Sequence, residues 1–476
     1  MVNRPALQTV LKRPWSWLLL AAFGFLLSQF SLMDPGRFYA WDEAIYVSEV
    51  SPHLDAIGMF AHRARGVTLL VAPILQVTES VVAVRSYMAV LSGIALGLSF
   101  LPWTRLYGWI GPLSAGLFAS TWLTIAWSSE VMPNLYSAFA AISGVGLSVL
   151  YVRSPSHRTL LGVFSAVFAT GLIRPLDCAV LVAVIWFIAG ARKRGIHRRL
   201  AGISLAGAGL AAIPWVIEAE LRFEGVLNRL DLIREVVGGG PTNNLSEYLR
   251  LLAAPLRSGV TATTPTIVAA WLGLLITLTA AAIVLKRDDR VPPILVAGAA
   301  AAFAAPYLIF SEAASPRFML PALGFLCIGT AMGLLKLGSM DRRRWVAVIA
   351  SLSLVACALL NFQIANRWST AQAEVRGISL TLGNLLAEVA DRPCYFLSSH
   401  GYPRISVASK CPGGGLATDP SVNNELFARE SAKGRSVHAF VLSGSPLKEL
   451  GERWSCHRVA RLPGTLWHHC TMDGST

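Results

Sequence analysis

The chain has 476 residues, of which 54% are hydrophobic and 14% are charged, and its mean hydropathy is +0.54. A soluble protein of this length does not need so much apolar surface, so the composition predicts a polytopic membrane protein. The formal net charge of +14 would indicate a nucleic-acid partner in a soluble protein. Here the basic residues gather in short loops between apolar stretches, which argues against nucleic acid.

Eleven apolar stretches are long enough to be predicted as membrane-spanning helices. Their approximate bounds are 15–33, 84–103, 109–129, 134–151, 159–173, 175–190, 200–217, 264–285, 291–310, 317–337 and 345–362. The first follows Lys12 and Arg13 but has no small-residue cleavage site after it, so it is predicted to be a retained helix rather than a signal peptide. Pro175 separates the fifth span from the sixth, because proline breaks a helix.

The orientation of the chain follows from its basic loops. These carry Arg105, Arg153, Arg158, Arg192, Lys193, Arg194, Arg198, Arg199, Lys286, Arg287, Arg290, Arg342, Arg343 and Arg344. If the N-terminus is cytoplasmic, all of them fall on the cytoplasmic side, as the positive-inside rule requires. A full crossing by the short apolar segment 66–78 would reverse every later loop, so this segment is predicted to be a re-entrant or interfacial helix.

Two long outer loops result, at 34–83 and 218–263. The first contains the acidic motif FYAWDEAIY (Phe38–Tyr46), directly after the first span. Adjacent carboxylates are costly beside a membrane, so Asp42 and Glu43 are candidate functional residues. The second contains RFEGVLNRLDLIREVV (Arg222–Val237), whose apolar residues recur at helical spacing, so an amphipathic interfacial helix is expected there. The sequence GGGP (Gly238–Pro241) is predicted to end it.

From residue 371 onward the composition is that of a soluble domain, so we divide the chain into a transmembrane domain at 1–370 and a tail domain at 371–476. Strand-like segments at 394–399, 438–443 and 455–462 alternate with helical ones, which predicts a small α/β domain. Its four cysteines, Cys394, Cys411, Cys456 and Cys470, predict two disulfides with three possible pairings. Disulfides require an oxidising compartment, which agrees with a tail outside the cytoplasm. The run His468–Cys470 matches no strong zinc signature.

The motif W-D-E-x-x-Y (Trp41–Tyr46) resembles that of the glycosyltransferase C superfamily, and is most similar to bacterial aminoarabinose transferases and protein O-mannosyltransferases. Three further segments are similar to family patterns: SVVAVRSYMAVLSG (Ser80–Gly93), MPNLYSAF (Met132–Phe139) and PRFMLPAL (Pro316–Leu323). The resemblance covers about residues 1–362. It departs from the family at HRARG (His62–Gly66), which has no proline, and at Asn134 and Arg174, where relatives often have aspartate and lysine.

The resemblance implies that a sugar is moved from a polyprenyl-phosphate donor to a lipid, glycan or protein acceptor, on the periplasmic face of a bacterial inner membrane. Asp42 would be the catalytic base, with inversion at the anomeric carbon, and Glu43 would position groups or contact a metal. Arginine suits phosphate oxygens, so Arg63, Arg65 and Arg317 are candidates for binding the donor phosphate. Tyr46, His62, Glu130 and Asn134 are expected in the substrate pocket. A divalent cation is compatible with the sequence but not required by it.

Other interpretations stay open at this stage. Asp42 and Glu43 can cap a helix, Arg317 can snorkel to lipid headgroups, and Arg63 and Arg65 can bind lipid phosphate without specificity. The alternative function is a transporter or lipid flippase. A transporter favours charges near the bilayer midplane and paired halves with broken helices. This chain has its carboxylates at one face and no evident internal repeat, so the sequence favours the enzyme.

Overall fold

The computed structural model describes residues 13–190, 194–237, 245–248, 264–285, 291–310, 314–417, 419–443, 450, 454–462 and 465–472. The basic connections at 191–193 and 286–290, the predicted helix end at Gly238–Pro241 and most of the rest of the second outer loop lie outside these residues. The chain divides into two compact units. The bundle unit comprises Met1–Met33, Phe60–Val67 and Arg85–Ser369, and the sheet unit comprises Asp34–Met59, Thr68–Val84 and Thr370–Thr476.

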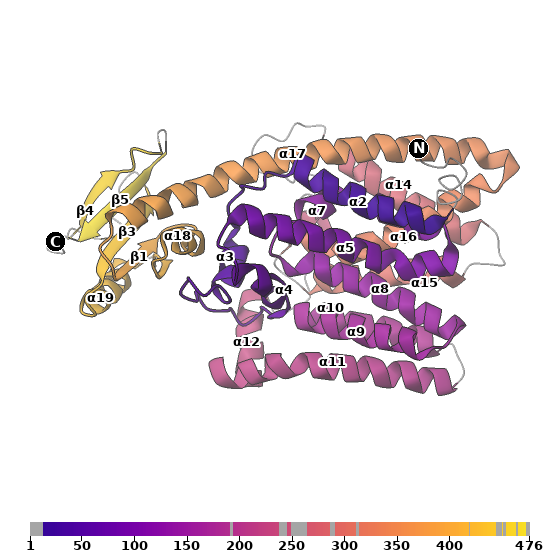
Figure 1. Ribbon diagram of the computed structural model, residues 1–476, viewed down its shortest axis with the longest axis horizontal. Coiled ribbons are helices and arrows are strands. Elements are labelled where there is room, and N and C mark those ends of the chain that lie inside the picture. The colour runs from indigo at the N-terminus through magenta and orange to yellow at the C-terminus, as the bar shows by residue number, and fades with distance from the viewer. Residues whose placement is uncertain are drawn as a thin grey trace, which may run out of the picture. The chain divides into compact units, whose positions relative to one another are not determined.

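The bundle unit is built from apolar helices that run side by side (Figure 1). Its helices are α2 (Pro14–Leu32), α6 (Ile110–Ala119), α7 (Trp122–Ala126), α8 (Pro133–Arg153), α9 (His157–Ile173), α10 (Pro175–Gly190), α11 (Arg194–Arg222), α12 (Val226–Val237), α14 (Thr264–Val284), α15 (Val291–Ile309), η2 (Pro316–Met319), α16 (Leu320–Gly338) and η3 (Asp341–Arg343). Three further helices, α4 (Gly66–Leu75), α5 (Val81–Tyr107) and α17 (Arg344–Val389), have residues in both units.

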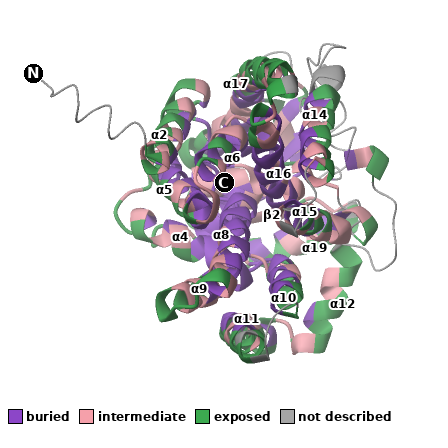
Figure 2. Ribbon diagram, turned by 90° about the vertical axis from the view of Figure 1, so that its right-hand side faces the viewer, coloured by how far each residue is buried: buried purple, intermediate pink, exposed green. Residues whose placement is uncertain are grey.

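The core of the bundle unit lies along α8 and α16, whose apolar stretches are 67% and 72% buried (Figure 2). The corresponding values for α2 and α11 are 17% and 22%. Helices that are apolar but exposed need an apolar solvent, which the hydrocarbon of a bilayer provides. Among the described residues, seven helices are long and apolar enough to cross a membrane, and five apolar helices are shorter. The polytopic helical fold class is therefore confirmed, whereas the count of eleven spans stays a prediction.

Basic helix ends lie together within the bundle unit. Figure 1 shows the end of α8 at the same end of the bundle as the starts of α11 and α17. By sequence, α8 ends with Arg153, and α11 and α17 begin with Arg194 and Arg344. The predicted interruption at Pro175 is also present, because α9 ends at Ile173 and α10 begins at Pro175.

The stretch predicted as one span at 109–129 forms two helices instead. Helix α6 ends at Ala119, and Thr121 begins α7 by accepting a hydrogen bond at Oγ1 from the Thr124 N–H at 3.1 Å. Asn361 Oδ1 accepts from the Trp122 N–H at 2.9 Å. Threonine is favoured at such helix starts because its hydroxyl satisfies a donor that the first turn leaves unpaired. The break is therefore stabilised by side chains that hydropathy does not register.

Helix α17 also differs from the prediction, which ended the last span at residue 362. The structure has one helix of 46 residues, Arg344–Val389. No proline or glycine occurs between Arg344 and Arg376, so nothing in this stretch interrupts the backbone hydrogen bonds.

The sheet unit contains a five-stranded sheet in the order β2-β1-β3-β5-β4. Its elements, besides the helices shared with the bundle unit, are α3 (Trp41–Ser48), β1 (Cys394–Ser398), α18 (Tyr402–Ser409), β2 (Gly413–Gly415), α19 (Pro420–Ser431), β3 (Ser436–Leu442), β4 (Trp454–Arg458) and β5 (Trp467–Met472). Strands β2, β1 and β3 pair in parallel, and β3, β5 and β4 pair antiparallel. The predicted C-terminal sheet is thus present, although β2 and β5 were not expected from the sequence.

Both faces of the sheet are covered. On one face, Phe396 and Phe440 pack with Leu386 of α17 and residues of α18. On the other, Leu397 and Val441 pack with Phe427 of α19. Of the three possible cysteine pairings, the structure has Cys394–Cys411 and Cys456–Cys470. The second bridge joins residues that lie opposite each other on β4 and β5.

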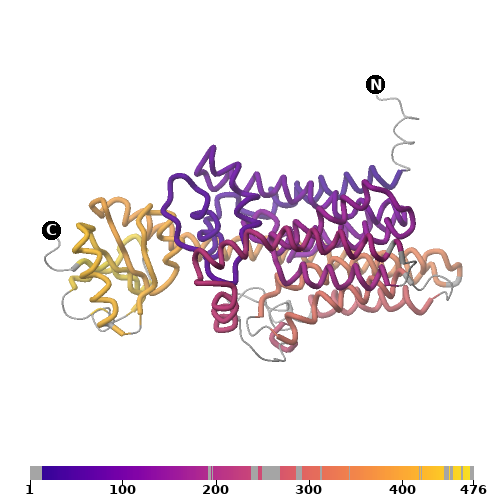
Figure 3. Tube along the Cα trace, turned by 90° about the horizontal axis from the view of Figure 1, so that it is seen from below, coloured from indigo at the N-terminus to yellow at the C-terminus, as the bar shows by residue number. Residues whose placement is uncertain are grey.

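The amphipathic helix expected at 222–237 is present as α12. Figures 1 and 3 show that α12 runs across the direction of α11, which it follows in the chain. A sharp connection separates the two helices, where Glu224 and Gly225 both have positive φ. Gly225, at φ +116°, adopts a backbone conformation that favours glycine.

Candidate active site

The acidic motif forms the short helix α3 in the sheet unit. Glu43 lies in its first turn and is fully buried, and its Oε2 accepts a hydrogen bond from the Ala40 N–H at 2.7 Å. Asp42 lies in the same turn but is only partly buried. Both carboxylates complement the positive end of the helix dipole. The two neighbours therefore differ in access: Glu43 is held inside, and Asp42 can be reached from outside.

Glu43 also has a distant partner that sequence reasoning did not identify. Arg376 of α17 is 1% exposed, and its Nη1 lies 3.3 Å from Glu43 Oε2. The same nitrogen donates to the Phe38 carbonyl at 3.1 Å. Arg376 thus links two residues of the motif, Phe38 and Glu43. Tyr46, one turn later on α3, is 4% exposed.

Helix α3 packs against α18 of the tail. The rings of Trp41 and Tyr402 meet edge to face, with centroids 6.1 Å apart. Within the sheet unit, the motif is therefore fixed by two segments from beyond residue 370, one through Arg376 and one through Tyr402.

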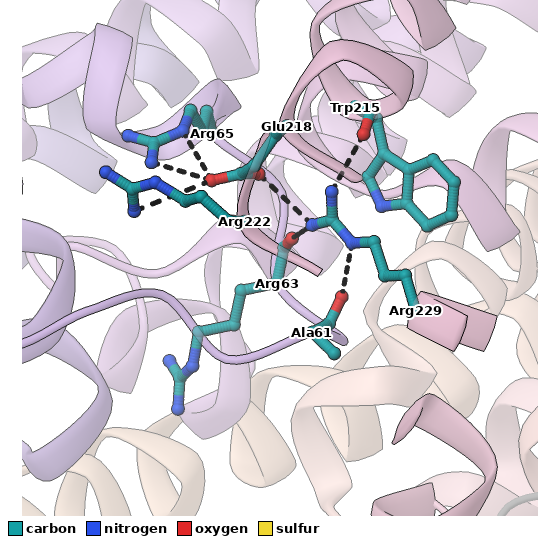
Figure 4. A network of polar contacts seen from close by, with 7 residues as sticks. All are labelled: Ala61, Arg63, Arg65, Trp215, Glu218, Arg222 and Arg229. Atoms are coloured by element: carbon teal, nitrogen blue, oxygen red, sulfur yellow. Dashed lines mark hydrogen bonds and ion pairs between the residues drawn. The ribbon is translucent and has the colours of Figure 1, made fainter. Parts of the chain in front are cut away.

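In the bundle unit, Glu218 gathers three arginines (Figure 4). Arg65 donates to its Oε1 from Nε at 2.9 Å and from Nη2 at 2.6 Å. Arg222 lies 3.9 Å from the same oxygen. Arg229 donates to Oε2 from Nη2 at 3.1 Å. The carboxylate is 6% exposed, so these charges interact with little screening by water.

Arg229 of α12 ties together the chain around residues 61–65. It is fully buried, and it donates to the carbonyls of Ala61 at 3.0 Å, Arg63 at 2.9 Å and Trp215 at 2.8 Å. Burial lowers the pKa of Arg229, and the carboxylate of Glu218 opposes that shift. The backbone that carries Arg63 and Arg65 is therefore held in place by a helix from the second outer loop.

Two candidate phosphate ligands, Arg63 and Arg65, consequently have different surroundings. Arg65 is bound to Glu218, whereas the Arg63 guanidinium points away from this network (Figure 4). Arg63 is 5% exposed, and its guanidinium lies 5.4 Å from the centre of the Phe60 ring. His62 is exposed, and its ring stacks on the same Phe60 ring, with the two centroids 6.1 Å apart. Next to them, Gly66 packs so closely on α9 that a Cβ there would lie 2.6 Å from the Leu172 carbonyl.

Arg317 of η2 lies in an aromatic cluster of the bundle unit. Its guanidinium is 5.1 Å from the Trp127 ring centre and 5.6 Å from that of Phe318. Arg174 lies 4.8 Å from the same Phe318 ring. The structure therefore brings Arg317 and Arg174 to one aromatic side chain.

Arg174 has a carboxylate partner as well. Its Nε lies 3.2 Å from Asp177 Oδ2, and its Nη2 donates to the Tyr307 hydroxyl at 2.7 Å. Ser137 donates to Asp177 at 2.6 Å. The sequence alone gave no signal for this network, in which Arg174 is joined by residues of α8, α10 and α15.

Glu130 and Asn134, two expected pocket residues, lie near the start of α8. Glu130 is fully buried, and its Oε2 is 3.7 Å from Nη1 of Arg85, which also donates to the Ser129 carbonyl at 2.9 Å. Asn134 is 2% exposed, and neither polar atom of its amide has a hydrogen-bond partner among the described residues. An unpaired buried amide costs about 1–3 kcal/mol, so such a group is typical of a place where a ligand completes the bonding.

The bundle unit also contains an apolar cavity of about 410 Å³ between α7, α14, α15 and α16. Its lining includes Trp122, Trp271, Ile276, Ala301, Met319 and Leu323. A cavity with so few polar atoms suits a hydrocarbon chain rather than a sugar. In the described part of the chain, no three His, Cys, Asp or Glu side chains are grouped so that they could hold a metal ion.

Known proteins are similar to this chain in structure but not detectably in sequence. No family model matches the sequence, and no curated protein matches it. ArnT from Cupriavidus metallidurans is similar in structure, at 12% identity and a TM-score of 0.67, over 96% of this chain and 97% of ArnT. The same values hold for ArnT bound to undecaprenyl phosphate.

Two other solved structures are similar over most of this chain. The oligosaccharyltransferase of Archaeoglobus fulgidus matches at 12% identity and a TM-score of 0.51, over 91% of this chain and 69% of its own. The mycobacterial arabinofuranosyltransferase AftD matches at 16% identity and 0.52, over 89% of this chain and 36% of its own. These identities are too low to transfer an activity, but the likeness extends over both units. The chain therefore shares its fold with ArnT, the oligosaccharyltransferase of Archaeoglobus fulgidus and AftD.

Proposed function

We propose that this protein is an integral-membrane glycosyltransferase that moves a sugar from a polyprenyl-phosphate donor to an acceptor at the periplasmic face. The observation that carries the proposal is the acidic motif, in which Glu43 is buried against Arg376 while Asp42 keeps partial exposure on the same helix turn. A motif used only to cap a helix needs one carboxylate, and Glu43 already fills that role. We assign the chemistry to Asp42 because it is the more accessible of the two carboxylates.

In the proposed step, the acceptor hydroxyl attacks the anomeric carbon as its proton passes to the Asp42 carboxylate. The bond from that carbon to the phosphate oxygen of the donor breaks, and the electron pair leaves with the polyprenyl phosphate. Attack from the face opposite the leaving group inverts the anomeric centre. No covalent sugar–enzyme bond is needed, so one carboxylate suffices.

The leaving phosphate gains negative charge in this step, and fixed cations lower the barrier by stabilising it. We assign this role to Arg317, beside Arg174, and to Arg63, whose guanidinium is directed away from the Glu218 network. Arg65 remains a candidate for the same role, although its guanidinium is bound to Glu218. Tyr46, His62, Glu130 and Asn134 are proposed to contact the sugar or the acceptor.

The prenyl chain of the donor is proposed to occupy the apolar cavity of the bundle unit. The structural likeness to ArnT supports this choice of carrier, since that protein has been solved with undecaprenyl phosphate bound. We further propose the bacterial inner membrane as the location, with a cytoplasmic N-terminus. This rests on the basic loops and on the two disulfides of the tail.

The proposal is tested first by removing the protein from its host and analysing the lipids by mass spectrometry. A polyprenyl-phosphate sugar should accumulate, and the acceptor that normally carries this sugar should lose it. Restoring the wild-type chain should reverse both changes. An unchanged pool of lipid-linked sugars would contradict the proposed donor.

The second test replaces Asp42 with asparagine, which preserves size and removes proton acceptance. We expect sugar transfer by the purified protein to fall by about 100-fold or more, because general-base catalysis contributes roughly that factor. Binding of the donor should be largely retained. The matched control is Asp55→Asn, an exposed aspartate elsewhere in the first outer loop, which should transfer sugar normally. Near-normal turnover by the Asp42→Asn protein would overturn the assignment of the base.

A further inference from the structure

A second arginine lies close to Arg376 in the sheet unit. Arg404 is on the first turn of α18, which follows Gly401. Gly401 has φ +70°, and a Cβ there would lie 3.0 Å from Arg404 Nη2 and 3.0 Å from Ser379 Oγ. The guanidinium of Arg404 and the hydroxyl of Ser379 on α17 therefore both border the space beside Gly401. A side chain at residue 401 would fill this space.

Arg404 has no ion pair with a carboxylate of the described residues. Its Nε is buried and has no hydrogen-bond partner among the described residues. Burial lowers the pKa of Arg404 to about 10, and the positive charge of Arg376 adds to the effect. Arg376 itself is paired with Glu43, so that carboxylate already has a cation. Arg404 therefore lies near a second positive charge, Arg376, and the ion pair described above joins Glu43 to Arg376 rather than to Arg404.

Such an arrangement is unfavourable for folding by itself. A partly desolvated guanidinium without a counter-ion is costly, and a like charge nearby raises the cost. Proteins keep groups of this kind where an anion binds. Arginine is the side chain best suited to phosphate oxygens, because its planar fork can donate two parallel hydrogen bonds. The Ser379 hydroxyl adds a neutral donor beside it.

The place of this pair in the sheet unit connects it with the acidic motif. Tyr402, two residues before Arg404, contacts Trp41 of the motif, and α18 packs on α3. The neighbouring Arg376 contacts Glu43 directly. A phosphate bound at Arg404 would therefore lie in the same unit as Asp42, beside the helix that carries it.

We propose that Arg404, assisted by Ser379, binds the phosphate group of a lipid substrate in the sheet unit. This inference rests on the proposed function and extends it, because it assigns a substrate-binding residue to the tail rather than to the bundle. The phosphate can belong to the polyprenyl donor or to a phosphorylated lipid acceptor. Both present the same oxygens to the arginine, and the experiment separates the two sources.

The test compares lipid binding by the full-length wild-type protein with that of Arg404→Gln and Arg404→Lys. The probes are undecaprenyl phosphate and short-chain phosphatidic acid, each titrated in detergent, and the thermal midpoint of each protein is measured without lipid. Arg404→Gln should bind one of the probes about tenfold more weakly. Its thermal midpoint should be equal to or above that of wild type, because an unpaired charge has been removed. Arg404→Lys should weaken binding less, since a point charge replaces the fork.

Weaker binding of undecaprenyl phosphate assigns the site to the donor, and weaker binding of phosphatidic acid alone assigns it to the acceptor. Arg429→Gln, an exposed arginine of α19, is the control and should bind both probes normally. Unchanged affinity for both probes in Arg404→Gln would overturn the inference. Should that variant not fold, Arg404→Lys decides, and wild-type affinity for both probes would then reject the site.

The outcome is separable from that of the proposed function. If wild type binds neither lipid, the proposed donor site fails as a whole and this site with it. If wild type binds undecaprenyl phosphate and the Arg404 variants bind it and phosphatidic acid equally well, only the role of Arg404 is rejected.

Discussion

At the scale of single residues, the acidic motif separates two chemically similar side chains by burial. Glu43 accepts from Ala40 and pairs with Arg376 in the interior, whereas Asp42 is partly exposed. Replacing Asp42 should therefore lower the rate of sugar transfer, whereas replacing Glu43 should lower the stability of the protein.

We predict that Glu43→Gln lowers the thermal midpoint of the purified protein, by the equivalent of about 1.5–3 kcal/mol. Glutamine keeps an oxygen for the Ala40 N–H but leaves the buried Arg376 without its charge partner. The control is Glu79→Gln, which removes a pair with Lys410 whose side chains are 40% and 42% exposed. Exposed pairs contribute about 0–1 kcal/mol. Equal losses in the two variants would contradict the anchoring role of Glu43.

Two histidines of the tail sheet predict a pH dependence. His438 Nδ1 lies 3.0 Å from His469 Nε2, and their rings are stacked. Burial lowers the pKa of both, that of His469 to about 4, and His438 adds to the shift of His469. Between pH 6.5 and pH 4, His469 is therefore protonated in the unfolded chain but neutral in the folded chain. The stability is therefore complete above pH 6.5 and falls as the pH drops toward 4.

The loss between pH 7 and pH 5 should reach about 2 kcal/mol from His469. It is measured as hydrogen-exchange protection of β3 and β5 in the whole protein, corrected for the intrinsic effect of pH on exchange. His469→Gln should remove most of the pH dependence. The neighbour His468, which contacts the Leu466 carbonyl, provides the control, and His468→Gln should behave like wild type. A wild-type sheet that is equally protected at both pH values would refute the prediction.

At the scale of elements, α12 positions the segment 61–65 through Arg229, whose counter-charge is the carboxylate of Glu218. Glu218→Gln should destabilise the protein by about 3 kcal/mol or more, because the fully buried Arg229 loses its counter-charge. Hydrogen exchange should increase at residues 61–65, whose carbonyls Arg229 holds. The control is Asp231→Asn on α12, because both side chains of the pair between Asp231 and Arg234 are exposed. A Glu218→Gln protein as stable as the control would show that the network is dispensable.

At the scale of the whole molecule, much of the fold follows from local sequence. Apolar length, the proline at Pro175 and the alternation in the tail are properties of neighbouring residues. The structure confirms the helical bundle, the interruption at Pro175 and the C-terminal sheet, whereas the number of spans stays a prediction. The break at Ser120 could not be found this way, because it depends on Asn361, which lies 239 residues from its partner Trp122. Hydropathy also could not distinguish a span that ends from a helix that continues, as α17 does.

The candidate site was less predictable than the fold for the same reason. Asp42 and Glu43 stand out within nine residues of sequence, but their context comes from far along the chain. Arg376 is 333 residues from Glu43, and Glu218 is 153 residues from Arg65. No periodicity or spacing encodes contacts of that range. From the sequence, a single arginine in a helical stretch is predicted to be a surface charge, and only the structure identifies its partner.

The orientation of the chain in the membrane yields the last prediction. The positive-inside rule predicts that residues 286–290 lie in the cytoplasm and the tail outside it, and the two disulfides of the tail agree with an oxidising compartment. A reporter that fluoresces only in the cytoplasm should be bright when fused after Arg290 and dark when fused after Thr476. A fusion after Arg158, the second residue of α9, serves as an independent cytoplasmic control and should be bright. If the tail fusion fluoresces and the Arg290 fusion does not, the crossings have been assigned with the wrong parity, and the acidic motif would then face the cytoplasm.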